Sequence, residues 1–469
     1  MLNRLQARHV GLLALGLASL GLMSLGWRRG EGQPPPLPQD PHIQVFLNQT
    51  ETNRYKDPYR RIQRSGDNLE QMLIDAIDQA DISIDVAVQE LNLPLVAQAL
   101  IDRFQAGVKV RVVLENQYSE PWSQHPPNWI ASQDDHSRGK YENLFAFGDM
   151  NGDGTITPDE AVQRDAILML RQADILMVND TDDGTKGSGL MHHKFMVVDG
   201  EQVITGSANF TLSDFHGDWL TPESRGNANA LLRINSPALA AAYSDEFNLM
   251  WGDGPGGESD SLFGSPKPAR PLQPVALPTG QVTVQFSPHR ADTPWEQTTN
   301  GLIAHALGQA SQSVDLALFV FTDQGIADAL MAHRTIQVRT LIDRSFIYRY
   351  HSEALDMLGV ALPDQRCKYE KDNRLWPSPI TTVGYPALAD GDKLHHKFAL
   401  LDDRAVMIGS HNWSKAANHK NDENLLIIEN ATVAQHFKQE FERLYRLAEL
   451  GHTEYLGMQM KKMEEKCGL

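Results

Sequence analysis

Two shortages in the sequence set the first limits on what this protein is. Only two of its 469 residues are cysteine, Cys367 and Cys467, so the chain is not a small scaffold held by many disulfides. The two cysteines either form one bond or remain free thiols. Basic residues are also scarce. The chain has 42 Lys and Arg against 60 Asp and Glu, and its net charge of −18 disfavours nonspecific binding to a polyanion, although local basic patches remain allowed.

The first residues have the pattern of a targeting signal. Arg4 and Arg8 precede an uncharged run of 18 residues, 10–27, and two further arginines follow it. A basic flank before a short apolar run at the extreme N-terminus predicts a secretory signal peptide or a signal anchor. The segment has no clear A-x-A cleavage site and no cysteine that would accept a lipid. We therefore expect an exported protein that is secreted, periplasmic or anchored to the membrane; a buried apolar helix is the alternative.

The rest of the chain reads as two copies of one α/β unit. In each copy an amphipathic helix pattern precedes a β-rich run, and another helix and strand follow. Asp85 and Asp315 occupy equivalent places in these strands. The pattern predicts an α/β fold of two similar lobes, each a central mixed sheet flanked by helices. The expected organisation is a leader at 1–30, a Pro-rich spacer at 31–42, an N-terminal lobe at 43–250, a linker at 251–280, a C-terminal lobe at 281–450 and a tail at 451–469.

The most specific feature is a short hairpin that occurs twice. "HHKFMVVDGEQVITGSAN" begins at His192 and "HHKFALLDDRAVMIGSHN" begins at His395, with nine of eighteen positions identical. Alternation along a strand places the first His and the Lys on one face and the second His on the other. Gly-Ser-x-Asn is expected to open a helix, whose backbone N–H groups would bind an anion. The candidate catalytic residues are His192, Lys194, Asp199, Ser207, Asn209, His395, Lys397, Asp402, Ser410 and Asn412.

Two such sets facing each other across a pseudo-twofold axis suit phosphodiester chemistry. One His would attack phosphorus, and the other would protonate the leaving oxygen. The paired Lys, Ser and Asn side chains would stabilise charge on the equatorial oxygens, which is the work of a metal pair in other phosphodiesterases. No metal is therefore expected in catalysis. Because one chain supplies both sets, we expect a monomer with one intramolecular site.

The repeated H-x-K-x4-D-x6-G-S-x-N pattern resembles the HKD signature of the phospholipase D superfamily, and the resemblance covers both lobes. It implies a covalent phosphohistidine at His192 or His395, with the other His acting as acid and then as base. Family precedent favours His192 as the nucleophile. The family also carries an acidic residue shortly after this pattern; Glu423 matches it, whereas the first half has Asn229. This difference predicts a site that is not fully symmetric, in which Glu423 orients one catalytic histidine.

The first half also contains an insertion. Its Asp-to-His distance exceeds that of the second half by a net 27 residues, because the aspartates are offset by 230 and the histidines by 203. The insertion includes "DMNGDGTITPDE" at 149–160, which has the spacing of an EF-hand loop with Gly154 at the sharp turn. We expect it to hold a structural Ca²⁺ ion, the alternative being an acidic turn without metal. The expected ligands are Asp149, Asn151, Asp153, the Thr155 carbonyl, Thr157 and Glu160.

Three functions compete for this sequence. The first is hydrolysis of membrane phospholipid, favoured by export, by the tethering spacer and by Phe215 and Trp219, which could contact lipid. The second is endonuclease activity on DNA or RNA. It is favoured by "GSHNWSKAANHKNDENLLII", which is similar to the endonuclease and cardiolipin-hydrolase branch, and a single strand could follow a basic groove at Arg339, Arg344 and Arg349. The third is a calcium-dependent binding module without catalysis. The expected partner is phospholipid or a membrane surface, with single-stranded nucleic acid as the alternative.

Overall fold

The computed structural model describes residues 35–185, 189–333 and 336–468, and the chain from Leu37 onward forms one compact unit. The predicted leader, 1–30, lies outside the described residues. Across the described residues, none of the helices combines the length and the apolar character needed to cross a membrane.

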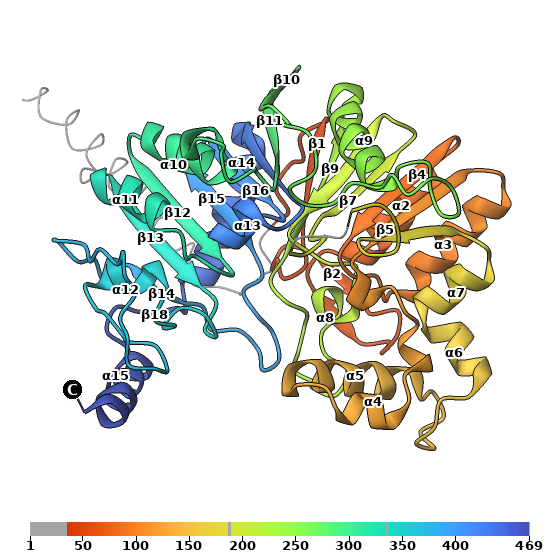
Figure 1. Cartoon of the computed structure of the whole chain (residues 1–469), viewed down its shortest axis with the longest axis horizontal. Helices are drawn as coiled ribbons and strands as arrows, with labels where there is room; N and C mark the ends of the chain where they lie inside the picture. Colours follow the sequence, from red (N-terminus) through yellow and green to blue (C-terminus); the bar gives the residue numbers. More distant parts are fainter. Residues whose placement is uncertain (1–34, 186–188, 334–335, 469) are drawn as a thin grey trace, which may run out of the picture. The chain divides into compact units, whose positions relative to one another are not determined.

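The N-terminal lobe is built on a mixed sheet with the strand order β1-β9-β8-β7-β4-β5-β6 (Figure 1). Strands β4, β5 and β6 run parallel, while β7, β8, β9 and β1 continue the sheet in antiparallel pairs. A separate small hairpin consists of β2 and β3. The strands are β1 (Ile43–Leu47), β2 (Arg54–Lys56), β3 (Gln63–Ser65), β4 (Ser83–Val88), β5 (Lys109–Leu114), β6 (Leu176–Asn179), β7 (Lys194–Val198), β8 (Gln202–Gly206) and β9 (Ala230–Asn235).

The C-terminal lobe repeats this arrangement in the sheet β10-β11-β17-β16-β15-β12-β13-β14-β18. From β11 to β14 the order matches that from β1 to β6 in the first sheet, and β12, β13 and β14 are again parallel. The predicted fold class, two mixed-sheet lobes, is confirmed. The strands are β10 (Gln273–Leu277), β11 (Gly280–Ser287), β12 (Ser313–Leu318), β13 (Gln337–Ile342), β14 (Val383–Tyr385), β15 (Lys397–Leu401), β16 (Ala405–Gly409), β17 (Glu423–Glu429) and β18 (Glu449–Leu450).

Matching ion pairs mark the duplication inside the sheets. Asp85 on β4 accepts two hydrogen bonds of 2.7 Å from Arg111 on β5, and Asp315 on β12 accepts two of 2.7 Å from Arg339 on β13. Such bidentate pairs fix the register of the parallel strands beside them. Asp85 and Asp315 are therefore equivalent in structure. Both hold neighbouring strands of their sheet together.

Helices cover both sheets, and one hydrophobic cluster joins the lobes. This cluster combines strand residues of both sheets with α9 and α14, whose apolar faces it buries. Each lobe also has one hydrophobic cluster of its own. The helices are α2 (Leu69–Asp78), α3 (Pro94–Gln105), α4 (Pro127–Ala131), α5 (Asp135–Gly148), α6 (Pro158–Arg164), α7 (Ala166–Gln172), α8 (Leu212–Phe215), α9 (Pro237–Trp251), α10 (Thr299–Gln309), α11 (Gln324–Ala332), α12 (Glu353–Leu358), α13 (Lys415–His419), α14 (Ala431–Tyr445) and α15 (Glu454–Cys467).

The connecting segments are more ordered than the sequence predicted. The last part of the expected linker forms β10, which pairs with β11, so the second sheet begins before residue 281. Part of the expected spacer also docks: Asp40 accepts hydrogen bonds from Asn430 and Thr279. Polar side chains of the C-terminal lobe thus fix the chain that leads into β1.

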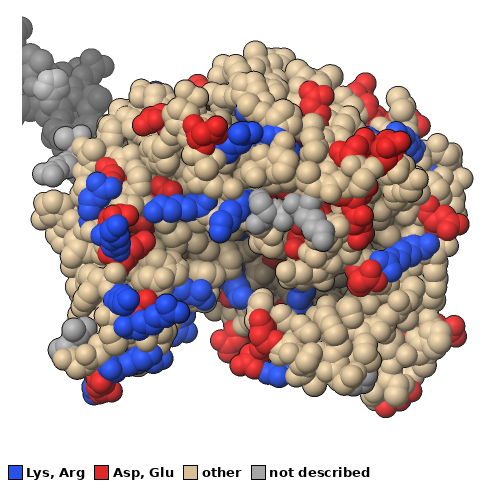
Figure 2. All heavy atoms as spheres, viewed as in Figure 1, with Lys and Arg blue, Asp and Glu red and all other residues tan. Residues whose placement is uncertain are grey.

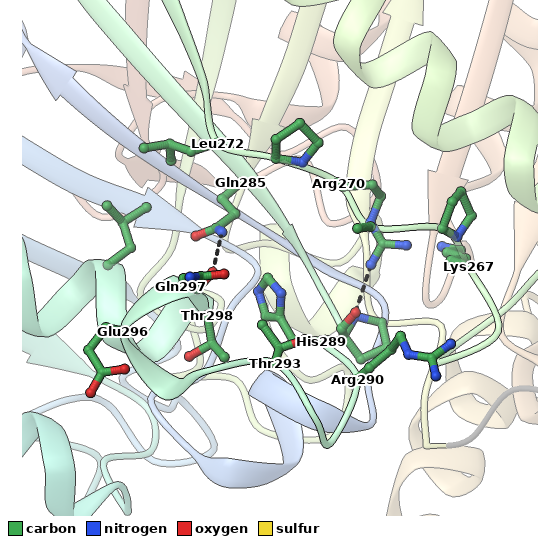
Figure 3. A pocket seen from close by; sticks show the side chains of 15 residues that line it. Lys267, Arg270, Leu272, Gln285, His289, Arg290, Thr293, Glu296, Gln297 and Thr298 are labelled. Carbon is green, nitrogen blue, oxygen red and sulfur yellow. Dashed lines mark hydrogen bonds between the residues drawn. The ribbon is translucent and has the colours of Figure 1, made fainter.

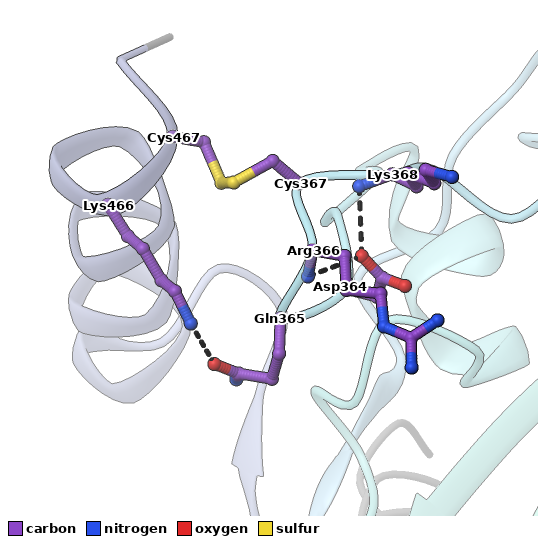
Figure 4. The surroundings of a disulfide bond; sticks show 7 residues. All are labelled: Asp364, Gln365, Arg366, Cys367, Lys368, Lys466 and Cys467. Carbon is purple, nitrogen blue, oxygen red and sulfur yellow. Dashed lines mark hydrogen bonds between the residues drawn. A yellow bond between two sulfur atoms is a disulfide. The ribbon is translucent and has the colours of Figure 1, made fainter.

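The predicted tail is a helix fastened to the C-terminal lobe. Cys367 and Cys467, left open by the sequence, form a disulfide that joins the end of α15 to a loop 100 residues earlier (Figure 4). Lys466 also contacts Gln365 beside the bond. A crosslink that closes so long a loop removes many conformations from the unfolded chain and so stabilises the fold.

Candidate active site

The two motif histidines begin the central hairpins of the two sheets. β7 starts at Lys194 and β15 starts at Lys397, so His192 and His395 lie two residues before the first residue of their strands. Strand alternation turns His193 and His396 to the opposite side, where their Nε2 atoms lie 3.1 Å from Glu246 on α9 and 3.0 Å from Glu440 on α14. The predicted division of each His-His-Lys triplet between two faces is confirmed.

Reciprocal backbone contacts bring the hairpins of the two lobes together. The N–H of His192 donates to the carbonyl of Asp422 at 3.0 Å, and the N–H of His395 donates to that of Ala228 at 3.0 Å. Each contact belongs to a short parallel bridge between the lobes. A pseudo-twofold relation produces such a matched pair of contacts, and both motifs therefore open onto one site.

The partners of the two catalytic imidazoles come from the opposite lobe and differ in charge. His192 Nδ1 lies 2.6 Å from Glu423 Oε2, whereas His395 Nδ1 lies 3.0 Å from Asn229 Oδ1. The predicted role of Glu423 thus applies to the histidine of the other motif. Because each Nδ1–H is held by an acceptor, each Nε2 is the nitrogen left for chemistry.

A second carboxylate, Asp214 on α8, also reaches this part of the site. Its Oδ1 lies 3.8 Å from His395 Nδ1, and it accepts hydrogen bonds from Asn227 and from the N–H of Asn209. Burial raises the pKa of this carboxyl. Sequence reasoning missed Asp214, although Thr211 and Asp214 have the spacing of a helix N-terminal capping box and the Thr211 side chain does cap α8.

Both motif lysines are buried beside the imidazoles. Lys194 Nζ donates to the His192 carbonyl at 3.0 Å, and Lys397 Nζ donates to the His395 carbonyl at 2.8 Å. Burial lowers the pKa of Lys194 to about 8, and burial together with the charge of Lys194 lowers that of Lys397 well below its ordinary value. Two buried lysines beside the imidazoles favour an anion, whose negative charge in turn favours the protonated form of each lysine.

The same surroundings keep the imidazoles neutral. Burial, followed by the nearby lysines, lowers the pKa of both His192 and His395 well below its ordinary value. A neutral imidazole has the lone pair that a nucleophile needs. A bound phosphodiester would bring negative charge and favour protonation of one ring, which supplies the general acid.

A cavity of about 450 Å³ contains both histidines. One face of α5, from the insertion, forms part of its wall together with Asn209, Asp214 and Phe319. Figure 2 shows this side of the molecule hollowed between the lobes, with Lys and Arg gathered over α12 and α15 and Asp and Glu on the facing edge of the N-terminal lobe. The α5 residues that line the cavity are Asp135, His136, Gly139, Lys140 and Asn143.

A second cavity, of about 560 Å³, lies elsewhere and contains neither motif histidine. Lys267 and Arg270 of the linker stand on one side of it, and Gln285 and His289 stand on the other (Figure 3). It is larger than the cavity between the lobes, but it lacks the pair of motif histidines. Chemistry therefore places the candidate active site in the smaller cavity.

Comparison with known proteins agrees with this geometry. A family model described as "Cardiolipin synthase, PLD-like domain" matches residues 73–251 and 303–445, most of the chain and both lobes. The chain belongs to the phospholipase D superfamily. It is accordingly a phospholipase D-like phosphodiesterase, with one copy of the motif in each lobe.

Named relatives match about one lobe of this phospholipase D-like chain. A mitochondrial cardiolipin hydrolase of Xenopus laevis is 28% identical over 184 residues, which are 38% of this chain and 73% of that protein. A phospholipase D of Rickettsia conorii is 29% identical over 141 residues, 30% of this chain and 60% of that protein. The solved phosphatidylserine synthase of Haemophilus influenzae covers 93% of both chains with a TM-score of 0.54 and 12% identity, so it shares the fold.

The motif aspartates of this phospholipase D-like chain lie outside the site, contrary to the prediction. Asp199 accepts hydrogen bonds from the backbone N–H groups of residues 81–83, and Asp402 does the same for residues 311–313. Each aspartate directly follows a five-residue strand, whereas the motif histidine lies before the start of that strand. Because a strand advances by about 3.3 Å per residue, the length of the strand separates the two side chains. The aspartates therefore hold the turns that enter β4 and β12 and do not contact substrate.

The Gly-Ser-x-Asn segments serve two purposes. Ser207 and Ser410 are buried and accept hydrogen bonds from the N–H groups of Ala230 and Asn424, which fixes the next strand. Asn209 lines the cavity. The expected helix does not begin at the motif, because α8 and α13 start three residues after each Asn and span only four and five residues. Contrary to the prediction from the sequence, the motif residues therefore do not open a helix whose N-terminus would bind an anion.

The segment 149–160 leaves the end of α5 and runs into the first turn of α6. Asp149 accepts hydrogen bonds from the N–H groups of residues 152–154, and Gly154 adopts φ 81° at the sharp turn. Glu160 accepts from the N–H groups of Met150 and Thr157 and so joins the two ends of the loop. Within the described residues no group of three or more His, Cys, Asp or Glu side chains is placed to hold a metal ion.

Two further expectations about the substrate surface are wrong. Phe215 is buried in the core, and Trp219 is half-buried against Phe147 and under Arg60, so these rings do not form a lipid-contacting edge. The expected basic groove is also not continuous, because Arg339 is neutralised by Asp315 and Glu442. Nearby, Arg344 stacks on Tyr385 and Tyr455, and Arg349 stacks on Phe346.

We predict that Asp199→Ala lowers stability without slowing catalysis. Three backbone N–H groups lose their acceptor, which costs about 1–2 kcal/mol of unfolding free energy, as the loss of a helix cap does. Urea unfolding measures the first effect, and turnover of bis(p-nitrophenyl) phosphate measures the second. Asp402→Ala should behave alike. A large fall in kcat in either variant at full folding would restore the aspartates to the catalytic set.

We also predict two limbs in the pH profile of kcat/KM. The rate should rise through a limb below pH 6.5, because the nucleophile His192 becomes neutral there, and fall near pH 8, where free Lys194 loses the proton that binds the phosphate. Lys194→Arg keeps a charge at all these pH values. Its remaining activity should no longer fall near pH 8. An unchanged alkaline limb in this variant would assign that titration to another group.

Proposed function

We propose that the protein is an exported phospholipase D-type enzyme that hydrolyses phospholipids through a phosphohistidine on His192. The observation that carries the proposal is the meeting of both motif histidines at one cavity, each beside a buried motif lysine, with a carboxylate hydrogen-bonded to only one of the two imidazoles. Glu423 stabilises positive charge on His192 as a bond to phosphorus forms. His395, held by the neutral Asn229, is the more suitable acid, because a proton on it is less strongly retained.

The reaction has two balanced steps. His192 Nε2 attacks phosphorus, the bond to the leaving oxygen breaks, and His395 donates its proton to that oxygen. His395 then takes a proton from water, whose oxygen attacks the phosphohistidine and releases His192. Lys194 and Lys397 stabilise the negative charge on the other phosphoryl oxygens in both steps, with Asn209 at the cavity wall. No step uses a metal.

Several features favour lipid as substrate. The net charge of −18 opposes a long polyanion, whose binding depends on many Lys and Arg contacts, whereas a lipid needs one phosphate in the pocket. Relatives are named cardiolipin hydrolase and phospholipase D. The Cys367–Cys467 disulfide suits an oxidising compartment and so supports export. The apolar leader would hold the enzyme near a membrane.

Nucleic acid is the second candidate substrate. The observation that favours it is the gathering of Lys and Arg over α12 and α15, beside the hollow between the lobes (Figure 2). A short single strand would place one phosphate between the histidines and adjacent phosphates on this surface. The net charge and the pairing of Arg339 oppose this function.

We predict turnover of phospholipid vesicles and little cleavage of single-stranded DNA, measured on one preparation. His192→Ala should lower turnover by about 10⁴-fold or more, as loss of a nucleophile does. His395→Ala should accumulate an acid-labile phosphohistidine, because the second step loses its base. DNA cleavage without lipid turnover would replace lipid by nucleic acid. Calcium-dependent vesicle binding with no turnover of either substrate would favour the non-catalytic module.

We further propose that loop 149–160 binds a structural Ca²⁺ ion. Oxygen-bearing side chains stand at the EF-hand positions, and Glu160 would turn from backbone N–H groups towards the ion. We predict that Ca²⁺ raises the melting temperature with an apparent Kd of about 10⁻⁴ to 10⁻³ M. Glu160→Gln should lose this response, while Glu142→Gln, an equal change of charge on α5, should keep it. A native protein that ignores Ca²⁺ would contradict the proposal.

A further inference from the structure

A buried cluster of charges lies behind the first motif. Lys267 Nζ lies 2.6 Å from Glu246 Oε1 and 2.8 Å from Asp422 Oδ1, and all three side chains are almost wholly excluded from solvent. They come from three parts of the chain: the linker, α9 and the segment before β17. Figure 3 shows Lys267 and Arg270 together at one side of the larger cavity, and Arg270 also contacts Glu246.

This cluster leads directly to His192. Asp422 accepts the His192 backbone N–H through its own carbonyl, and the N–H of Gly264 contacts both oxygens of its carboxylate at 3.0 and 3.1 Å. The next residue, Glu423, holds His192 Nδ1 at 2.6 Å. If Asp422 moved, the acceptor of the His192 backbone N–H and the carboxylate that holds His192 Nδ1 would therefore move together.

The second motif has no such arrangement. The backbone N–H of His395 meets Ala228, which carries no charge, and its imidazole meets the neutral Asn229. The equivalent of Glu246 is Glu440, which is paired with Arg443 three residues along the same helix. Behind the first motif the buried cation is therefore Lys267, which comes from the linker. Behind the second motif it is Arg443, which comes from the same lobe as the motif.

We propose that Lys267 is a positioning residue for the nucleophile. By holding the Asp422 carboxylate against α9, it fixes the segment that carries Glu423 and so aligns His192 with phosphorus. The linker is then a part of the active site and not only a connection between lobes. This inference rests on the proposed nucleophilic role of His192.

Removal of the Lys267 charge should be visible in the titration of His192. An uncompensated Asp422 carboxylate favours the imidazolium, so the pKa of His192 rises and the acid limb of kcat/KM moves to higher pH. Asp422→Asn removes that negative charge and leaves Lys267, so its acid limb moves to lower pH. The other titratable groups around His192 are the same in both variants: His193, Lys194, His395, Lys397, His411 and Glu423.

The experiment compares Lys267→Met, Asp422→Asn and Arg443→Met in the full chain, with bis(p-nitrophenyl) phosphate as substrate. We expect Lys267→Met to lower kcat by about 10²-fold, the cost of a small misplacement of a reacting group, with KM changed by less than about twofold. Lys267→Arg should recover part of kcat. Arg443→Met removes a largely buried cation at Glu440, and it should lower the melting temperature with kcat and the acid limb close to those of the native protein.

Two results would overturn the inference. The first is that Lys267→Met and Arg443→Met lose kcat equally, and that the acid limb of kcat/KM does not move in opposite directions in Lys267→Met and Asp422→Asn. A purely structural role of Lys267 predicts that pattern. The other, decisive even if Lys267→Met does not fold, is an Asp422→Asn enzyme with native kcat and an unmoved acid limb. Failure of the lipid proposal alone would leave this test intact, because the substrate is a synthetic phosphodiester.

Discussion

The backbone N–H of His192 donates to Asp422, the N–H of His395 donates to Ala228, and the rest of the active site depends on this crossed pair of contacts. They hold the starts of two hairpins from different lobes side by side. They also bring Glu423 and Asn229 to the imidazoles of the opposite motif. A hydrophobic cluster shared by both sheets supports the contacts, so the lobes cannot separate without exposing apolar surface.

The site combines two buried lysines with two buried carboxylates that do not neutralise them by direct pairing. Lys194 and Lys397 donate to backbone carbonyls, while Glu423 and Asp214 face the imidazoles. Burial of the lysines costs free energy that a bound phosphate recovers, because the anion supplies the missing counter-charge. The site is therefore arranged for charge that develops during the reaction and not for the unliganded protein.

The insertion in the first lobe links the cavity to the loop at 149–160. One face of α5 lines the cavity, and the same helix ends at Asp149, the first position of the loop. The second lobe has no comparable insertion, so the cavity walls differ although the motifs match. The motif residues thus follow the duplication, whereas most of the cavity wall around them belongs to the first lobe.

The sequence by itself determined the two lobes, the family and the repeated pairs of His and Lys, because strand alternation and a repeated hairpin are local patterns. Only the tertiary structure decided which partners these groups have. Glu423 reaches His192 across 231 residues, Asp214 enters from α8, and Asp199 faces a turn outside the site. Such contacts depend on how the lobes dock and on the direction in which each strand runs, which local periodicity does not encode.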